Sequence, residues 1–145
     1  MTLLSKFNWP AELVRVIDGD SYEVMLDRGF GDYSVRYIRL KGLNTPEARG
    51  EEEKKAGLRV THFVRSLMLH YPLTHVYSYA VDSFGRILAN VVLEGERDLA
   101  TILWDVGLAI PHLEPKRPKF EKSMLETIYD SIDTEEKIKK IISGL

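Results

Sequence analysis

The feature that most constrains the fold of this chain is the order in which its hydrophobic periodicity changes. Apolar and polar residues alternate in three consecutive segments, and this period of two predicts half-buried strands. Apolar residues then recur at three- and four-residue spacing from about 53 to 69, which predicts an amphipathic helix. Two more alternating segments follow that helix. The predicted strands are, in chain order, 11–17, 22–26, 33–41, 73–81 and 87–93.

Five strands with a helix between the third and the fourth are typical of a small Greek-key barrel of the OB type. A second helical pattern covers about 99–106, and Gly107 can end it as a left-handed residue. Apolar positions from Phe120 to Ile142 predict one or two more helices, with a break near Asp133, where a capping-box spacing begins. We therefore expect an α+β fold: a five-stranded OB-type Greek-key β-barrel with about three packed helices.

Length and composition indicate one domain. A chain of 145 residues is near the most common domain size, and 44% hydrophobic with 29% charged residues is an ordinary globular balance. The absence of cysteine excludes disulfides, thiol chemistry and cysteine-bound zinc. We expect a single domain over 1–145, with a C-terminal helical segment at about 118–145, acting as a monomer away from membranes. The first residues lack a signal-peptide pattern, which favours an intracellular or phage-related setting.

The charge balance limits how the chain could attract a polyanion. It has 20 basic and 22 acidic residues, which give a formal net charge of −2. No general positive field surrounds such a protein, so any nucleic-acid binding must be local to a patch.

Three short stretches contain the residue types that phosphodiester chemistry needs. Each has an ordinary structural interpretation by itself, as a hairpin turn or a proline-stiffened loop. Together they supply oxygen ligands, a candidate base and two guanidinium groups. The stretches are Val16-Ile-Asp-Gly-Asp20, Arg39-Leu-Lys-Gly-Leu-Asn-Thr-Pro-Glu47 and Asp82-Ser-Phe-Gly-Arg86.

Phosphodiester hydrolysis uses these groups in distinct ways. A hard cation on oxygen ligands polarises a phosphate oxygen, and a carboxylate takes a proton from attacking water. Guanidinium groups stabilise the extra charge that develops at phosphorus. The three stretches offer no serine or cysteine positioned as a nucleophile, so we expect direct attack by water.

The same stretches, followed by Gly107-Leu-Ala109, resemble the staphylococcal (thermonuclease-like) nuclease domain over about Ala11 to Ala109. The resemblance implies an OB-type barrel and calcium-dependent cleavage of DNA and RNA with little sequence preference. It also implies three metal ligands: the carboxylate of Asp20, the side chain at position 44 and the backbone carbonyl of Thr45. The family has aspartate where this chain has Asn44, so one negative charge is missing and the resemblance implies looser calcium binding.

The resemblance assigns catalytic roles to three further positions. Glu47 matches the proposed general base, and Arg39 and Arg86 match the phosphate-binding arginines. The family prototype has Lys-Tyr where this chain has Ser83-Phe84, so a cation and a phenolic hydroxyl are absent there. Phe84 could still stack on a base.

Two alternatives stay open at this stage. A domain of the same fold could bind nucleic acid or a protein partner with weak or no catalysis, and the negative net charge favours that mildly. A purely structural module would leave the co-occurrence of Asp20, Arg39, Glu47 and Arg86 unexplained. The four histidines do not have the spacing of zinc ligands, and we expect none of them to be catalytic.

Overall fold

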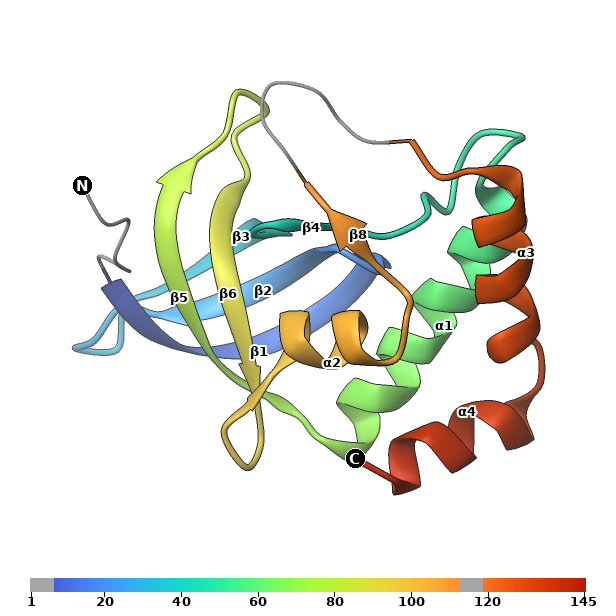
Figure 1. Ribbon diagram of the computed structural model, residues 1–145. Helices are drawn as coiled ribbons and strands as arrows, with labels where there is room; N and C mark the ends of the chain where they lie inside the picture. The colour runs from blue at the N-terminus through green and yellow to red at the C-terminus, as the bar shows by residue number, and fades with distance from the viewer. Residues whose placement is uncertain (1–6, 113–118) are drawn as a thin grey trace.

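The computed structural model describes residues 7–112 and 119–145 and shows a β-barrel with helices against one end (Figure 1). The strands are β1 (Phe7–Asp18), β2 (Ser21–Asp27), β3 (Tyr33–Leu40), β4 (Leu43–Asn44), β5 (Leu73–Val81), β6 (Ile87–Leu93), β7 (Arg97–Asp98) and β8 (Ile110–Pro111). The helices are α1 (Lys54–His70), α2 (Leu99–Asp105), α3 (Lys122–Ser131) and α4 (Glu135–Ser143).

The five long strands form a closed barrel in the order β3-β2-β1-β5-β6. Four of the pairings are antiparallel, and the parallel pairing of β3 with β6 closes the barrel. The predicted OB-type α+β fold is therefore confirmed. The two-residue strands β4 and β8 pair with each other outside this sheet, and β7 extends it beside β6.

Strand β1 begins earlier than its sequence pattern predicts. Its first four residues pair with β5, from Phe7 opposite Ser78 to Pro10 opposite His75, before the rest of the strand pairs with β2. The predicted start at residue 11 was wrong because local alternation stops at Pro10. The partner that extends the strand comes from a distant part of the chain, which no local pattern reveals.

The structure contains four helices among the described residues, rather than about three. Helix α1 matches its prediction within one residue, and Gly107, at φ +78°, follows the end of α2 as expected. The break near Asp133 is present, but the cap is Thr134, whose hydroxyl accepts from the Lys137 amide at 3.3 Å. Asp133 instead forms an ion pair with Lys137 at 2.8 Å.

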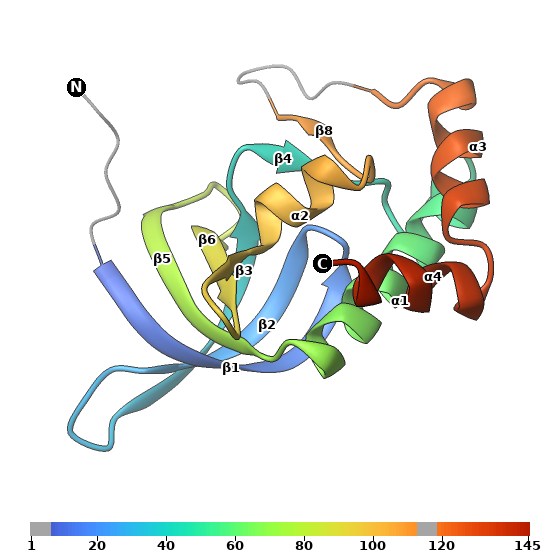
Figure 2. The same cartoon turned by 60° about the horizontal axis from the view of Figure 1, so that its bottom comes forward.

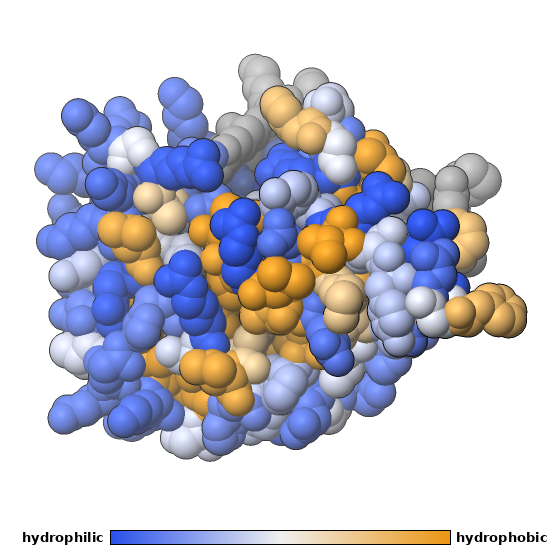
Figure 3. All heavy atoms as spheres, turned by 180° about the vertical axis from the view of Figure 1, so that it is seen from behind, coloured by the Kyte–Doolittle hydropathy of each residue, from blue (hydrophilic) through white to orange (hydrophobic). Residues whose placement is uncertain are grey.

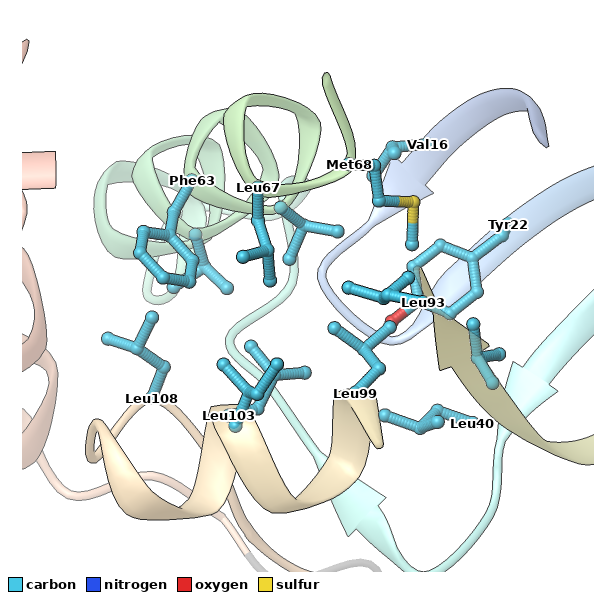
Figure 4. Close-up of a cluster of buried hydrophobic side chains, with 14 of the residues drawn as sticks. Val16, Tyr22, Leu40, Phe63, Leu67, Met68, Leu93, Leu99, Leu103 and Leu108 are labelled. Carbon is cyan, nitrogen blue, oxygen red and sulfur yellow. The ribbon is translucent and has the colours of Figure 1, made fainter. Parts of the chain in front are cut away.

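Helix α1 lies between the barrel and the C-terminal helix pair, as the view in Figure 2 shows. Its apolar face, including Phe63 and Leu67, meets Leu103 of α2 and the neighbouring residue Leu108 in one core (Figure 4). The ring of Tyr22 from β2 extends the same core into the barrel. Because these side chains are almost completely buried, α1 has a fixed position relative to the barrel.

The face opposite to the view of Figure 1 is mostly hydrophilic, with a group of hydrophobic atoms in its middle (Figure 3).

Within the described residues, the helices include none with the length and apolar composition that spanning a membrane requires.

A glycine in α1 sets the distance between this helix and the chain that precedes it. A Cβ atom on Gly57 would lie 1.9 Å from the carbonyl oxygen of Glu47, a backbone atom that cannot rotate away. The helix and the Glu47 peptide can therefore approach closely only because residue 57 has no side chain.

We predict that Gly57→Ala destabilises the protein, although alanine is the better helix former by about 1 kcal/mol. Overpacking of a filled site typically costs about 1–3 kcal/mol, and here that cost should exceed the gain in helix propensity. Urea unfolding of both proteins measures the difference, with Leu58→Ala at the exposed neighbouring position as control. Equal or greater stability of Gly57→Ala would contradict the close packing.

Candidate active site

The register of the barrel gathers the chemistry-bearing stretches at one edge. Asp18 at the end of β1 is opposite Ser21 of β2, and Ser21 is opposite Arg39 of β3. Cross-strand partners share a face of the sheet, so these three residues form a row across three strands. The parallel pairing of β3 with β6 then places the 82–86 turn, which precedes β6, beside the same row.

Two adjoining hollows lie over this row. The larger hollow has a volume of about 760 Å³, and the smaller hollow has about 320 Å³. Five of the six residues predicted from the sequence line the larger hollow: Asp20, Arg39, Asn44, Glu47 and Arg86. The sixth, Thr45, is completely buried, and its amide donates a hydrogen bond to Asp20 Oδ2 at 2.9 Å. The fold thus brings all six positions into one region.

A buried polar network holds the base of the larger hollow. Asp20 and Arg39 are 6% and 7% exposed, and Arg39 Nη2 lies 3.5 Å from Asp20 Oδ2. The Thr45 amide reaches the same carboxylate oxygen. Removing one member of such a buried pair leaves the other charge uncompensated, so the loss of either Asp20 or Arg39 would destabilise the folded protein.

The Arg39 guanidinium donates hydrogen bonds to neighbouring residues of its own segment. Nη1 donates to the carbonyls of Leu40 and Leu43, at 2.7 and 2.8 Å. Nη2 donates to the amide oxygen of Asn44 at 2.6 Å. The bonds fix the turn between β3 and β4, and they leave fewer N–H groups for a phosphate than an arginine in open solvent would have.

A hydrogen bond from Arg39 sets the orientation of the Asn44 amide. Its Oδ1 atom accepts the guanidinium bond, so the amide nitrogen faces the other way. That nitrogen is buried and has no hydrogen-bond partner among the described residues. An unsatisfied buried donor is costly, and a carboxylate at this position would remove it.

The Glu47 backbone is held from two sides. Its amide donates to Glu53 Oε1 at 2.9 Å, and the next amide, of Ala48, donates to Asp18 Oδ1 at 3.1 Å. Glu53 is the residue before α1, but its side chain makes no cap bond to that helix. Glu53 therefore holds the Glu47 backbone in position rather than capping α1.

The 82–86 turn presents Arg86 and Phe84 from the opposite wall. Asp82 Oδ1 accepts from the amides of Phe84 and Arg86, both at 2.9 Å, and Oδ2 accepts from Arg86 Nε at 2.9 Å. Partial burial alone would raise the pKa of Asp82, but these bonds and the adjacent guanidinium outweigh it and hold the pKa below its usual value. Gly85, at φ +80°, supplies the left-handed residue that this tight turn requires.

Asp18 has the opposite electrostatic environment. Burial raises its pKa, and the nearby charges of Asp20 and Glu47 raise it further, against the hydrogen bond from Ala48 and the charge of Arg49. Burial and its acidic neighbours together therefore disfavour the ionised form of Asp18.

The donor chemistry of the cleft fits a hard cation held loosely. The carboxylate and amide oxygens of the cleft are ligands that calcium prefers, and a cation would offset the repulsion from Asp20 and Glu47 that adds to the effect of burial on the pKa of Asp18. Within residues 7–112 and 119–145, however, no three His, Cys, Asp or Glu side chains gather closely enough to hold a metal by themselves. Asn44 also directs its oxygen to Arg39. Water and substrate oxygens would have to complete the coordination.

Several cleft residues had no assigned role in the sequence analysis. Asp18 and Asp82 belong to the quoted stretches, so their positions were visible although their contacts were not. Arg49 and His112 line the hollows without any motif that would reveal them. The amide of His112 bonds to the carbonyl of Gly42 at 2.9 Å, which is a tertiary contact.

We predict that Asp18→Asn stabilises the protein at neutral pH in the presence of a chelator. The pKa of Asp18 in the folded state is above the ordinary 3.8, so between these two values the unfolded state has lost its proton while the folded state still holds it. Wild-type stability therefore falls as pH rises through that interval. Asparagine removes this cost and keeps an acceptor for the Ala48 amide. Urea unfolding across pH should show the gain disappearing below pH 3.8. Asp32→Asn removes an exposed charge and serves as control. If Asp18→Asn stabilises the protein no more than this control does, the destabilising effect of the Asp18 charge is refuted.

The chain was compared with curated proteins and with models of protein families. A search of curated proteins gave no match. The sequence model of the family described as staphylococcal nuclease homologue matches residues 37–136, which is more than half of the chain. That segment contains Arg39, Asn44, Thr45, Glu47 and Arg86, and the turn between β1 and β2 adds Asp20 to them. The chain therefore belongs to the family of staphylococcal nuclease homologues.

Proposed function

We propose that this protein is a calcium-dependent endonuclease, a phosphodiesterase that hydrolyses DNA or RNA by direct attack of water with little sequence specificity. The single observation that carries the proposal is the shared hollow. Glu47, Arg86 and the Asp20–Arg39 network line one cleft, although they come from three separate parts of the chain. Family membership makes nuclease activity the natural chemistry for such a cleft.

Asp20, Asn44 and the Thr45 carbonyl would hold the calcium ion, as the family pattern implies. When bound, calcium supplies positive charge to a phosphate oxygen and so favours attack at phosphorus. The buried Asp20 carboxylate is the anionic member of this set. It is held in place by the Thr45 amide and by Arg39.

Glu47 is the proposed general base, and it takes a proton from the attacking water. Its backbone is fixed by Glu53 and by the close approach of Gly57, so its position is set by α1. Arg86 directs its guanidinium into the cleft from the opposite wall, with Nε on Asp82, and stabilises developing phosphate charge. Arg39 contributes charge from the base of the cleft.

A binding module with weak or no cleavage is the second candidate, and one observation favours it. Arg39 already donates three hydrogen bonds to Leu40, Leu43 and Asn44, so it has limited capacity for a phosphate. The net charge of −2 points the same way. The two candidates share nucleic acid as ligand and differ in whether the phosphodiester bond breaks.

We predict that Glu47→Gln lowers the rate of single-stranded DNA and RNA cleavage by about 10²–10⁴-fold, because glutamine keeps the shape and removes the base. The measurement is a cleavage assay with calcium, magnesium or chelator. Glu52→Gln, which changes an exposed acid in the same connecting segment, serves as control. Undiminished cleavage by Glu47→Gln would eliminate Glu47 as the base, and binding without cleavage by wild type would favour the second candidate.

We predict that Asn44→Asp increases calcium affinity. The substitution nearly preserves shape, adds one full negative charge beside Asp20 and removes the unsatisfied amide donor. The calcium concentration for half-maximal cleavage should fall in parallel. Isothermal titration of both proteins with calcium tests this directly, and equal or weaker binding would show that position 44 does not face the ion.

A further inference from the structure

The groups proposed to act on the phosphate stand at the boundary between two hollows. Asp18, Ser21, Glu47 and Arg86 line both the larger and the smaller hollow. The remaining residues of the larger hollow extend to one side, toward Phe84 and His112. Those of the smaller hollow extend along β3 and the segment after Glu47. A chain molecule with its phosphate at the shared residues would therefore have room on both sides.

The walls of the smaller hollow have the chemistry that recognises a nucleotide. Tyr37 is on the same face of β3 as Arg39, two residues earlier, and it is 47% exposed. Arg49 lines the same hollow and is an exposed cation close enough to Asp18 to affect its ionisation. An exposed aromatic face stacks on any base, and a guanidinium binds a phosphate.

The larger hollow has the same combination on its own side. Phe84 is 82% exposed there, and the Arg86 guanidinium carbon lies 5.5 Å from the centre of its ring. Each hollow thus has one exposed aromatic ring and access to an arginine. This repetition on either side of Glu47 matches a substrate that carries a nucleoside on each side of one phosphate.

Local charge does not oppose a polyanion beside Tyr37. The residue across the sheet from it, Glu23, forms an ion pair with Arg15 at 3.4 Å. The carboxylates at the boundary, Asp18 and Glu47, share the smaller hollow with Arg49 and Arg86. Tyr33 has a more acidic environment than Tyr37, because it lies at the start of β3 and lines a separate depression with Glu12 and Asp27.

We propose that the smaller hollow is a second nucleoside subsite, in which Tyr37 stacks on the base and Arg49 contacts a flanking phosphate of a single-stranded nucleic acid. The inference rests on the proposed function and extends it, because it assigns recognition to both sides of the bond that breaks. Tyr37 is a substrate-binding residue in this scheme and takes no part in the proton transfer.

Three small substrates test the subsite: a dinucleoside monophosphate and the two methyl phosphodiesters that each lack one of its nucleosides. Wild type should cleave the dinucleoside compound with the highest kcat/KM. Tyr37→Ala should lower kcat/KM about tenfold for the dinucleoside compound and for the one ester that keeps the nucleoside on the Tyr37 side. The ratio between the two esters should therefore change. Phe84→Ala should change that ratio in the opposite direction.

Matched variants separate stacking from other effects. Tyr37→Phe keeps the ring and should retain wild-type selectivity, and Tyr33→Ala, on the same strand face but outside the hollow, should match wild type with every substrate. Arg49→Gln should weaken binding of a single-stranded oligonucleotide and reduce the dependence of affinity on salt. Equal loss by Tyr37→Ala with both esters, or no loss, overturns the subsite while the nuclease proposal stands.

A failure of the nuclease proposal would look different. If wild type cleaves none of the three compounds, fluorescence anisotropy with a labelled single-stranded oligonucleotide decides the subsite by itself. Binding about tenfold weaker in Tyr37→Ala than in Tyr37→Phe then supports it, and equal binding by the two variants overturns it.

Discussion

The parallel pairing of β3 with β6 is the constraint on which the site depends. It closes the barrel through only three residue pairs, Ile38–Ile87, Arg39–Leu88 and Leu40–Ala89. These pairs place the turn before β6 beside the end of β3, so Arg86 and Arg39 share a cleft. Without closure, the two arginines would lie on opposite edges of an open sheet, because β3 and β6 end the run β3-β2-β1-β5-β6.

The cleft that this closure forms holds both signs of charge. Arg39, Arg49 and Arg86 lie beside several carboxylates, among which Asp18 is kept where burial and its acidic neighbours disfavour its ionised form. With a net charge of −2 on the whole chain, attraction of a polyanion must act at short range, through contacts with these guanidinium groups. Exposed rings such as Phe84 are important in this setting, because stacking does not depend on a long-range field.

Local patterns were sufficient for most of the fold. Alternation and helical spacing located the five barrel strands and α1, because each depends on neighbours within a few residues. They did not reveal the pairing of the start of β1 with β5, the two-residue strands β4 and β8, or the shift of the last cap from Asp133 to Thr134. Those features depend on partners distant in sequence or on competing ion pairs, such as Asp133 with Lys137.

The sequence by itself determined which residue types the site could use, since Asp20, Arg39, Asn44, Glu47 and Arg86 could be named from their motifs. Only the tertiary structure decided which hydrogen bonds those groups make and what holds them in position. Arg39 binds its own backbone and Asn44, and Glu53 and Gly57 position the Glu47 peptide. The physical reason is that a motif specifies chemistry locally, whereas hydrogen bonds and close packing join segments that only barrel closure brings together.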